Sequence, residues 1–220
     1  SLNSAPYTWL TYGESQSQLL SFFARATYNY DERYVVTATY RFDGSSKFAG
    51  ANKWAQFPSF AAAWRISNEP WFKRLKFVFP GFTSAKLRIG WGMVGNQGIP
   101  SYQTTYRYSA SSVATHDNAS HKLVSVASNS IPSKELKWET TTQYNAGLDL
   151  DFFDGRLVLA VDGYYKLTED LLQTKILPGS AGINNPYVNM GSISNTGFEL
   201  TLNTVPVATK NVEWTIGGNF

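Results

Sequence analysis

The strongest constraint on the fold of this chain is the alternation of residue types between positions 138 and 152. Every second residue is aromatic, aliphatic or a threonine, and the residues in between are mostly charged, amide-bearing or glycine. Because successive side chains of a strand point to opposite faces, this segment is expected to be one strand between an apolar and a polar environment. The apolar face would carry Trp138, Thr140, Thr142, Tyr144, Ala146, Leu148, Leu150 and Phe152, without a single charge.

The same alternation recurs along most of the chain and predicts an all-β fold of about eight antiparallel strands. Aromatic residues make up 15% of the 220 residues, which is typical of a strand-rich chain. Helical periodicity is almost absent, although residues 67–75 (SNEPWFKRL) are compatible with a short helix. The other predicted strands are 20–30, 34–42, 60–64, 87–93, 157–165, 198–202 and a last one from 212 to the chain end.

The connections between these strands alternate in length. Those after the first, fifth and seventh strands are short, and those after the second, fourth and sixth are long and polar. The longest runs from about 96 to 137. An up-and-down transmembrane β-barrel has short periplasmic turns and long outer loops, and its tilted strands need about ten residues. The chain therefore fits a segment of about eight strands from a larger barrel.

A secreted, soluble β-sandwich that binds carbohydrate remains the alternative, because the two faces of a sandwich strand alternate in the same way. Its strands usually run about five or six residues, which is shorter than several of those here. Aromatic residues near strand ends favour the membrane interpretation, since they would form the interfacial girdles of a barrel. The residues concerned are Trp138, Phe152, Tyr40, Phe42 and Trp64.

Composition excludes several classes of function. Without cysteine the chain has neither a disulfide framework nor a thiolate metal site. The net charge is only +3 and the basic residues are scattered, so no nucleic-acid partner is expected. No signal peptide and no membrane helix of roughly 20 apolar residues is expected. His116 and His121 lie in a loop rich in Ser, Ala and Asn that lacks the ligand set of a metal site, so we expect neither a metal nor a cofactor.

A G-x-G-x-x-G motif occurs at Gly90, Gly92 and Gly95. The dinucleotide fingerprint needs a helix to open inside the motif, because the pyrophosphate binds the free N–H groups of that helix. Here the motif runs into residues 96–100 (NQGIP), which are typical of a turn and end in a proline that cannot lie inside a helix. The glycines are therefore expected to belong to a strand.

Five stretches, spread over nearly the whole length of the chain, resemble a known protein family. They are YRFDGSSKFA (40–49), FPSFAAAWRISNEPWF (57–72), KLRIGWGMVGNQ (86–97), residues 135–172 and ISNTGFELTLN (193–203). In this order they resemble the barrel of SusC/RagA-type TonB-dependent outer-membrane transporters of Bacteroidetes. The resemblance implies a barrel of about 22 strands with an N-terminal plug domain.

The resemblance also implies a location and partners. Such transporters lie in the outer membrane, contact its lipid, and import oligosaccharides or peptides together with a SusD-like surface lipoprotein that closes as a lid. The inner-membrane TonB complex drives them through an N-terminal region. Residues 1–220 would be a partial barrel domain from the C-terminal half, with the plug, the TonB box and the final strands absent.

Three tyrosines of the longest loop are candidate ligand-binding residues, namely Tyr102, Tyr106 and Tyr108. Their apolar ring faces suit stacking on sugar rings. Packing within the loop or against the lid protein explains the same residues equally well. All three interpretations remain open from the sequence.

Charged residues on the polar faces of the strands are segregated along the chain. The first four strands place mostly basic residues there, and the last four mostly acidic ones. Such a wall would seat a plug of complementary charge, although ordinary cross-strand pairing is the alternative. The predicted plug-facing residues are Arg41, Lys86, Arg88, Asp149 and Asp151.

Catalysis is not expected from this sequence. Glu139, Asp149 and Asp151 share one strand face and suggest a pair of glycosidase carboxylates. However, polar residues must occupy the non-lipid face of any membrane strand, and the acids of glycosidases usually come from separate elements. We therefore predict no catalytic residue and a non-enzymatic role as the wall and outer rim of an import channel.

Overall fold

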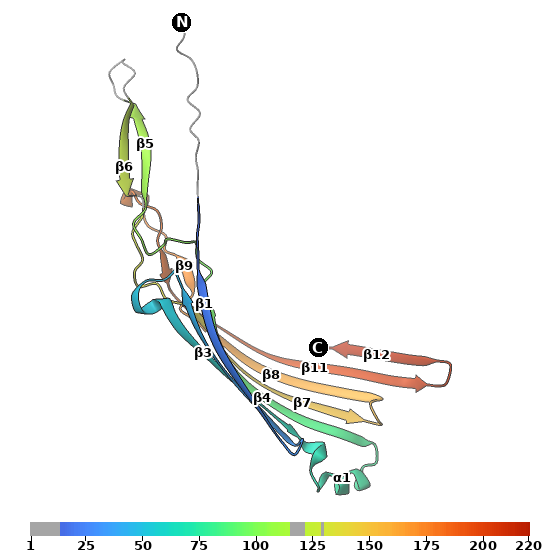
Figure 1. The fold of residues 1–220 in the computed structure, drawn as a ribbon. Coiled ribbons are helices and arrows are strands. Elements are labelled where there is room, and N and C mark those ends of the chain that lie inside the picture. The colour runs from blue at the N-terminus through green and yellow to red at the C-terminus, as the bar shows by residue number, and fades with distance from the viewer. Residues whose placement is uncertain (1–13, 115–121, 129) are drawn as a thin grey trace.

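The computed structural model describes residues 14–114, 122–128 and 130–220, and its main feature is one curved antiparallel sheet of eight strands (Figure 1). Neighbouring strands follow the order of the chain, and two short hairpins lie outside the sheet. The predicted all-β, up-and-down fold class is confirmed. His116 and His121 lie outside the described residues. The strands of the sheet are β1 (Leu19–Tyr30), β2 (Tyr34–Ser45), β3 (Trp54–Arg65), β4 (Phe82–Asn96), β7 (Glu139–Phe152), β8 (Leu157–Glu169), β11 (Ser192–Ala208) and β12 (Glu213–Asn219).

Several strands are longer than the alternation of residue types predicted. β11 begins at Ser192, although Ser192 to Gly197 are residues typical of a turn. These residues pair with the upper half of β8, from Ser192 opposite Glu169 to Gly197 opposite Tyr164. A neighbouring strand thus supplies hydrogen-bond partners that override the local preference of the segment.

One end of the sheet, here called the turn end, has the short connections 31–33, 153–156 and 209–212. The connection from β3 to β4 also lies there and holds η2 (Ile66–Asn68) and α1 (Phe72–Val78) (Figure 1). The short helix expected at 67–75 is present but begins later, because Pro70 disfavours helical backbone at Glu69, whose ψ is 141°. No helix among the described residues is long and apolar enough to span a membrane.

The opposite end, here called the outer rim, consists of the long connections 46–53, 97–138 and 170–191. The longest, predicted as a polar loop, contains the hairpin of β5 (Tyr108–Ala114) and β6 (Lys122–Ser128). Its strands are rich in Ser and Ala, so the sequence offered little apolar contrast. The rim also contains η1 (Gly50–Lys53), β9 (Leu172–Thr174), η3 (Gly179–Ala181) and β10 (Tyr187–Asn189).

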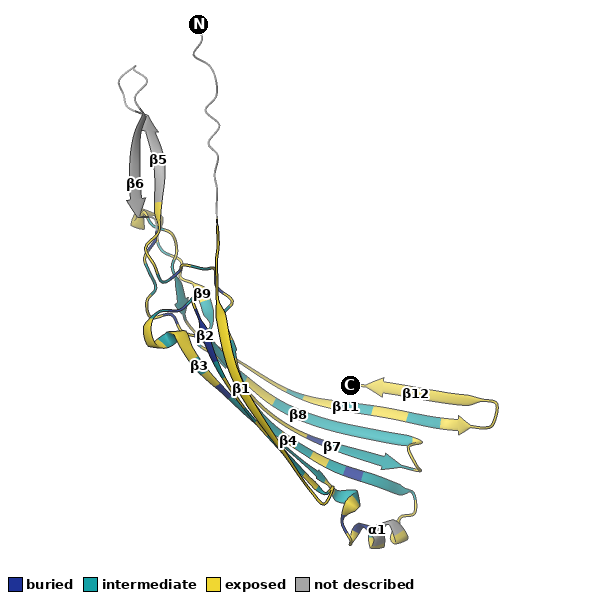
Figure 2. Ribbon diagram, in the orientation of Figure 1, coloured by how far each residue is buried: buried dark blue, intermediate teal, exposed yellow. Residues whose placement is uncertain are grey.

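Strand register gathers apolar side chains on one face of the sheet, here called the apolar face. One cross-strand row contains Tyr28, Val36, Ala62, Ile89, Ala146, Gly163 and Phe198. Large members such as Tyr28, Ile89 and Phe198 are exposed. Figure 2 shows that most strand residues are exposed or intermediate and few are buried. Exposed apolar rows of this extent must be covered by an apolar medium, and the hydrocarbon core of a bilayer is such a medium.

We expect an arginine to be tolerated on the polar face of β7 and rejected on the apolar face. Leu148 lies between Leu87 and Val161 on the apolar face, whereas Asn145 lies between Gly90 and Tyr164 on the opposite face. In a full-length protein that contains this segment, Leu148→Arg should cost about 2 to 4 kcal/mol at the bilayer midplane. The yield of folded, heat-modifiable barrel in membranes should fall for Leu148→Arg and stay at the parental level for Asn145→Arg. Equal yields of the two variants would contradict the assignment of the faces.

Candidate functional site

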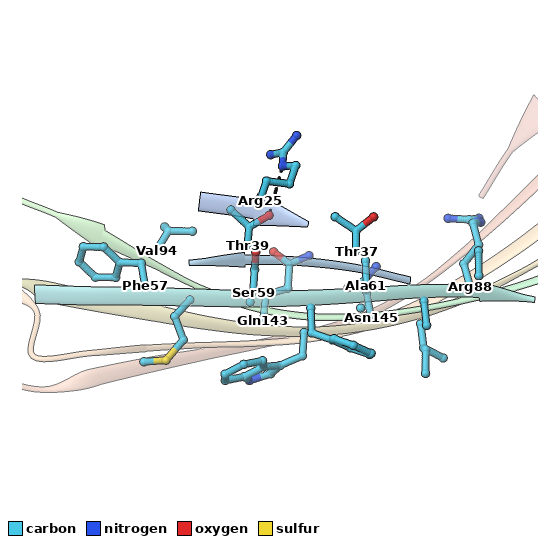
Figure 3. A pocket seen from close by; sticks show the side chains of 18 of the residues that line it. Arg25, Thr37, Thr39, Phe57, Ser59, Ala61, Arg88, Val94, Gln143 and Asn145 are labelled. Atoms are coloured by element: carbon cyan, nitrogen blue, oxygen red, sulfur yellow. Dashed lines mark hydrogen bonds between the residues drawn. The ribbon is translucent and has the colours of Figure 1, made fainter. Parts of the chain in front are cut away.

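On the face opposite the apolar one, here called the polar face, residues of β1, β2, β3, β4 and β7 contribute to a shallow hollow of about 660 Å³. Figure 3 shows the labelled side chains of Arg25, Thr37, Thr39 and Gln143 on one side of the sheet. Arg25 Nε donates a hydrogen bond of 3.2 Å to Thr39 Oγ1. The hollow therefore presents hydroxyl, amide and guanidinium groups, which can hydrogen-bond to a polar solute or to another protein segment.

A charged cluster spans three strands of this face. Arg88 donates hydrogen bonds to both carboxylate oxygens of Asp149, at 2.8 Å from Nε to Oδ2 and 2.8 Å from Nη2 to Oδ1. Its Nη2 also donates to Asp162 Oδ1 at 2.9 Å. Arg88 is opposite Gly147, and Gly147 is opposite Asp162. A Cβ at Gly147 would overlap Asp162 and Arg88, so this glycine lets the guanidinium lie across β7.

Four of the five predicted plug-facing residues lie together on β4 and β7. Lys86 Nζ is 4.0 Å from Asp149 Oδ2, and Arg88 pairs with the same carboxylate. Asp151 accepts a hydrogen bond of 2.5 Å from Ser84. The basic and acidic halves of the wall thus meet at the boundary of β4 and β7 and partly neutralise each other. Contact with a plug stays a prediction.

The fifth, Arg41, lies apart on β2. Its Nε is 2.8 Å from Asp43 Oδ2, and its guanidinium carbon lies 5.4 Å from the centroid of the Phe57 ring. Asp43 is buried, and within the described part of the chain its Oδ1 has no hydrogen-bond partner. The guanidinium is therefore held by one carboxylate oxygen and one aromatic ring.

A small buried cluster joins the outer rim to the top of the sheet. The ring centroid of Trp138 lies 5.3 Å from that of Phe48 and 5.6 Å from that of Phe57. Its Nε1 donates to the carbonyl of Lys53 at 3.3 Å. The prediction that Trp138 belongs to the apolar face and an interfacial girdle was therefore wrong, because the residue precedes β7 and turns inward. The complete cluster is Phe48, Phe57, Ile99, Leu136 and Trp138.

Polar contacts tie the rim connections together. The side-chain amide of Asn189 donates to the carbonyls of Lys137 and Asp170, both at 2.8 Å. Its oxygen accepts from the Lys137 amide at 2.9 Å. Lys137 Nζ also lies 2.7 Å from Asp170 Oδ2. Asn189 thus fixes two connections at once, a role that its turn-rich sequence context did not reveal.

The three candidate tyrosines have different surroundings. Tyr106 lines an open cleft of about 820 Å³ together with Lys134, Lys175 and Tyr187. Tyr102 has a left-handed backbone (φ 65°), and its hydroxyl accepts a hydrogen bond from the Gln16 amide at 3.1 Å. Tyr108 is exposed at the start of β5. Of the three, Tyr106 alone is among the residues that line this cleft.

The glycine motif lies inside the continuous strand β4, as predicted. A Cβ at Gly90 would overlap the Asn145 side chain, and one at Gly95 would overlap the Phe57 ring. The same holds on β11, where a Cβ at Gly197 would overlap Tyr164. These glycines make room for larger side chains of neighbouring strands.

The suggested glycosidase carboxylates have other contacts. Glu139 accepts a hydrogen bond from the Leu172 amide at 3.0 Å and another from Asn96 Nδ2 at 3.1 Å. Asp149 is bound to Arg88, and Asp151 to Ser84. The described residues contain no group of three or more His, Cys, Asp or Glu side chains placed to hold a metal ion. Each of these three carboxylates therefore has a hydrogen-bond partner on a neighbouring strand or connection.

Comparisons with known proteins match nearly the whole chain. A family model described as TonB dependent receptor-like, beta-barrel covers residues 2–220. TonB-dependent receptor SusC of Bacteroides thetaiotaomicron is 36% identical over 210 residues, which are 93% of this chain and 20% of that protein. TonB-dependent receptor P26 of Formosa agariphila is 37% identical over 93% of this chain and 20% of its own length. The chain thus spans about a fifth of these relatives.

A solved structure shows the same fold. The RagAB peptide transporter superposes with a TM-score of 0.78 and 28% sequence identity. The match covers 92% of this chain and 21% of the chain in that structure. The curved sheet described here is therefore similar to about a fifth of that chain.

We expect Gly95→Ala to destabilise the outer rim. The new methyl group must displace the Phe57 ring, which is 3% exposed and packed against Trp138. Overpacking of this kind costs about 1 to 3 kcal/mol. Gly163→Ala is the matched control, because nothing lies within 4 Å of a Cβ at that position. Urea unfolding of the detergent-solubilised receptor should give a lower midpoint for Gly95→Ala only. Equal midpoints for the two variants would show that the ring moves without cost.

Proposed function

This chain belongs to the TonB-dependent receptor-like β-barrel family, its place is the outer membrane, and we propose that it forms part of the wall and outer rim of an import channel. One observation supports this most directly. The sheet separates a continuous apolar face from a polar face, and its long connections gather at one end. In an outer-membrane barrel these would be the lipid side, the lumen and the extracellular loops.

The alternative of a soluble carbohydrate-binding sandwich loses its support. A sandwich buries the apolar face of one sheet under a second sheet about 10 Å away. Within the described residues the two remaining sheets are hairpins of two strands each, and the apolar face of the large sheet is uncovered. The similarity to a transporter barrel points the same way.

We propose that the cargo is an oligosaccharide or a peptide and that the complete protein is not an enzyme. A SusD-like surface lipoprotein would close over the outer rim, and the TonB complex would drive transport through an N-terminal region outside this chain. The relatives support this in part, since one is called SusC and another structure is called a peptide transporter. The rim supports it through its cleft, which combines the exposed Tyr106 ring with lysine side chains.

Transport should depend on TonB, and Tyr106 should contribute to cargo binding. We expect the purified full-length receptor to bind at least one member of a panel of neutral oligosaccharides and short peptides. Tyr106→Ala should weaken that binding by about 0.5 to 1.5 kcal/mol, which is roughly two- to tenfold in Kd. Isothermal titration gives the affinity, and uptake by cells with and without TonB tests the coupling.

Tyr102→Phe is the control for that experiment, because it keeps the ring and removes only the hydroxyl that contacts Gln16. Its affinity should equal that of the parent. Uptake that persists without TonB would overturn the proposed function. A Tyr106→Ala variant with unchanged affinity would remove only the assignment of this tyrosine.

We further propose that the charged cluster on β4 and β7 contacts the plug. Arg88 and Asp149 have exposed fractions of 34% and 32% in their side chains, so each retains a surface directed away from the other. The charges that remain accessible are those that a plug domain would meet. Salt and motion would weaken such contacts, which suits a plug that must move.

A charge swap separates plug contact from pairing within the wall. Arg88→Asp and Asp149→Arg alone each break the ion pair, whereas the double variant restores a pair of opposite polarity. If the plug makes electrostatic contacts with these residues, the double variant should still show faster proteolysis of the plug than the parent, and leakage of small antibiotics. The three variants together form a cycle with an expected coupling of about 0.5 to 3 kcal/mol. Full protection of the plug in the double variant would mean that the charges only stabilise the wall.

A further inference from the structure

The connection between β3 and β4 folds back onto the apolar face at the turn end. Glu69 is 7% exposed and accepts hydrogen bonds from Tyr34 Oη at 2.7 Å and Trp64 Nε1 at 3.1 Å. Tyr34 is opposite Trp64 in the sheet, and their rings stack with centroids 6.2 Å apart. Because this pair continues the apolar rows of β2 and β3, Glu69 is bound on the side of the sheet that faces lipid.

Charge holds this attachment in place. Arg33 Nη1 lies 3.4 Å from Glu69 Oε2 and comes from the short turn between β1 and β2. The hydrogen bond from Tyr34, followed by that from Trp64, lowers the pKa of Glu69 below its ordinary value. The carboxylate therefore stays ionised at neutral pH and keeps its cationic partner.

A second contact fixes the helix itself. Phe72 opens α1, is 2% exposed, and lies with its ring centroid 5.0 Å from that of Phe82. Phe82 in turn stacks on Phe152 at 5.1 Å. Phe152 alternates with Leu150 and Leu148 on the apolar face of β7. The start of α1 is thus packed against the outer surface of the wall and does not point into the lumen.

The remaining apolar side chains of this connection have nothing to cover them in the described structure. Phe77 is 88% exposed, and Trp71, Val78 and Phe79 are also exposed. Four large apolar residues in nine consecutive positions are more than scattered surface residues would give. The start of α1 is packed on the apolar face through Phe72. We therefore expect the lipid that covers that face to cover these four side chains as well.

The polar residues of the same segment fit a membrane surface. The seven residues of α1 include three basic ones, Lys73, Arg74 and Lys76, and no acidic one. Helices that lie in an interface combine Trp and Phe on one side with Lys and Arg near the headgroups, where the cations meet lipid phosphate. A neighbouring protein would explain the apolar residues but gives no reason for their continuity with the apolar face.

We propose that residues 71–79 are an interfacial anchor that inserts Trp71, Phe77 and Phe79 into the periplasmic leaflet of the outer membrane. The turn end determines the leaflet, because short connections of such barrels lie on the periplasmic side. Arg74 is exposed and takes the headgroup level. Glu69 and Phe72 are the positioning residues that hold the anchor against the wall.

Depth measurements on single spin labels test this proposal. The segment has no cysteine, so Phe77→Cys introduces one site within it, and other cysteines of the full-length receptor are replaced first. The labelled receptor is reconstituted in vesicles of phosphatidylethanolamine and phosphatidylglycerol. Accessibility to oxygen, which enters lipid, is compared with accessibility to a nickel complex, which stays in water.

The control label is at Ile176→Cys. Ile176 lies on the outer rim and is 85% exposed, which is close to the 88% of Phe77. We expect the label at 77 to favour oxygen and the label at 176 to favour the nickel complex. Equal preference for the nickel complex at both positions would overturn the anchor. Protection of position 77 from both reagents, or spin coupling between labels, would overturn it in favour of a protein partner or a second copy.

A second measurement covers the case in which the label disturbs the segment. The double variant Phe77→Glu, Phe79→Glu should lower the thermal midpoint of the receptor by more in vesicles than in detergent micelles, because the detergent molecules of a micelle can rearrange around the two carboxylates. Phe77→Leu, Phe79→Leu keeps the apolar character and should match the parent in both. A loss of equal size in vesicles and micelles would show that these residues serve folding alone and would also overturn the proposal.

Discussion

The structure depends on one constraint: the backbone N–H and C=O groups of each strand must form their hydrogen bonds with the neighbouring strands of the sheet. Where one face of the sheet contacts lipid, no water is present to hydrogen-bond the backbone N–H and C=O groups. Only a continuous ladder of hydrogen bonds between strands satisfies these groups. The ladder runs from β1 to β12 in chain order. Its register then decides which face each side chain meets, because a shift by one residue would exchange the two faces. The charged cluster on β4 and β7 follows from that register, as does the apolar face.

The features that the sequence revealed are those with a local signal. Alternation by two residues marks every strand of the sheet, so the fold class and the two faces were predictable. Trp138 shows the limit of this signal, since its parity placed it on the apolar face while the chain turns inward just before β7. Asn189 and Glu69 had no local signal at all. Their partners Lys137 and Tyr34 are 52 and 35 positions away, and only the assembled sheet brings them together.

The two ends of the wall solve the same problem by different means. At the outer rim, a buried apolar cluster and the side-chain amide of Asn189 hold together the connections that lie outside the main sheet. At the turn end, one ionised carboxylate gathers groups from three segments, Arg33, Tyr34 and Trp64. Both arrangements satisfy buried polar groups with main-chain carbonyls, ring donors or opposite charge, as burial requires. The sheet between them can then carry a polar face without a core of its own.

The glycines of the polar face set the free width beside the wall. Arg88 lies across Gly147, Asn145 across Gly90 and Tyr164 across Gly197, so these side chains run along the sheet and do not project straight out from it. A methyl group at any of these glycines would overlap the neighbouring side chain and push it away from the sheet. The bore of a channel built from such a wall is consequently governed by its smallest residues, and a survey of pore radius along related barrels should follow glycine positions more closely than the sizes of the large polar residues.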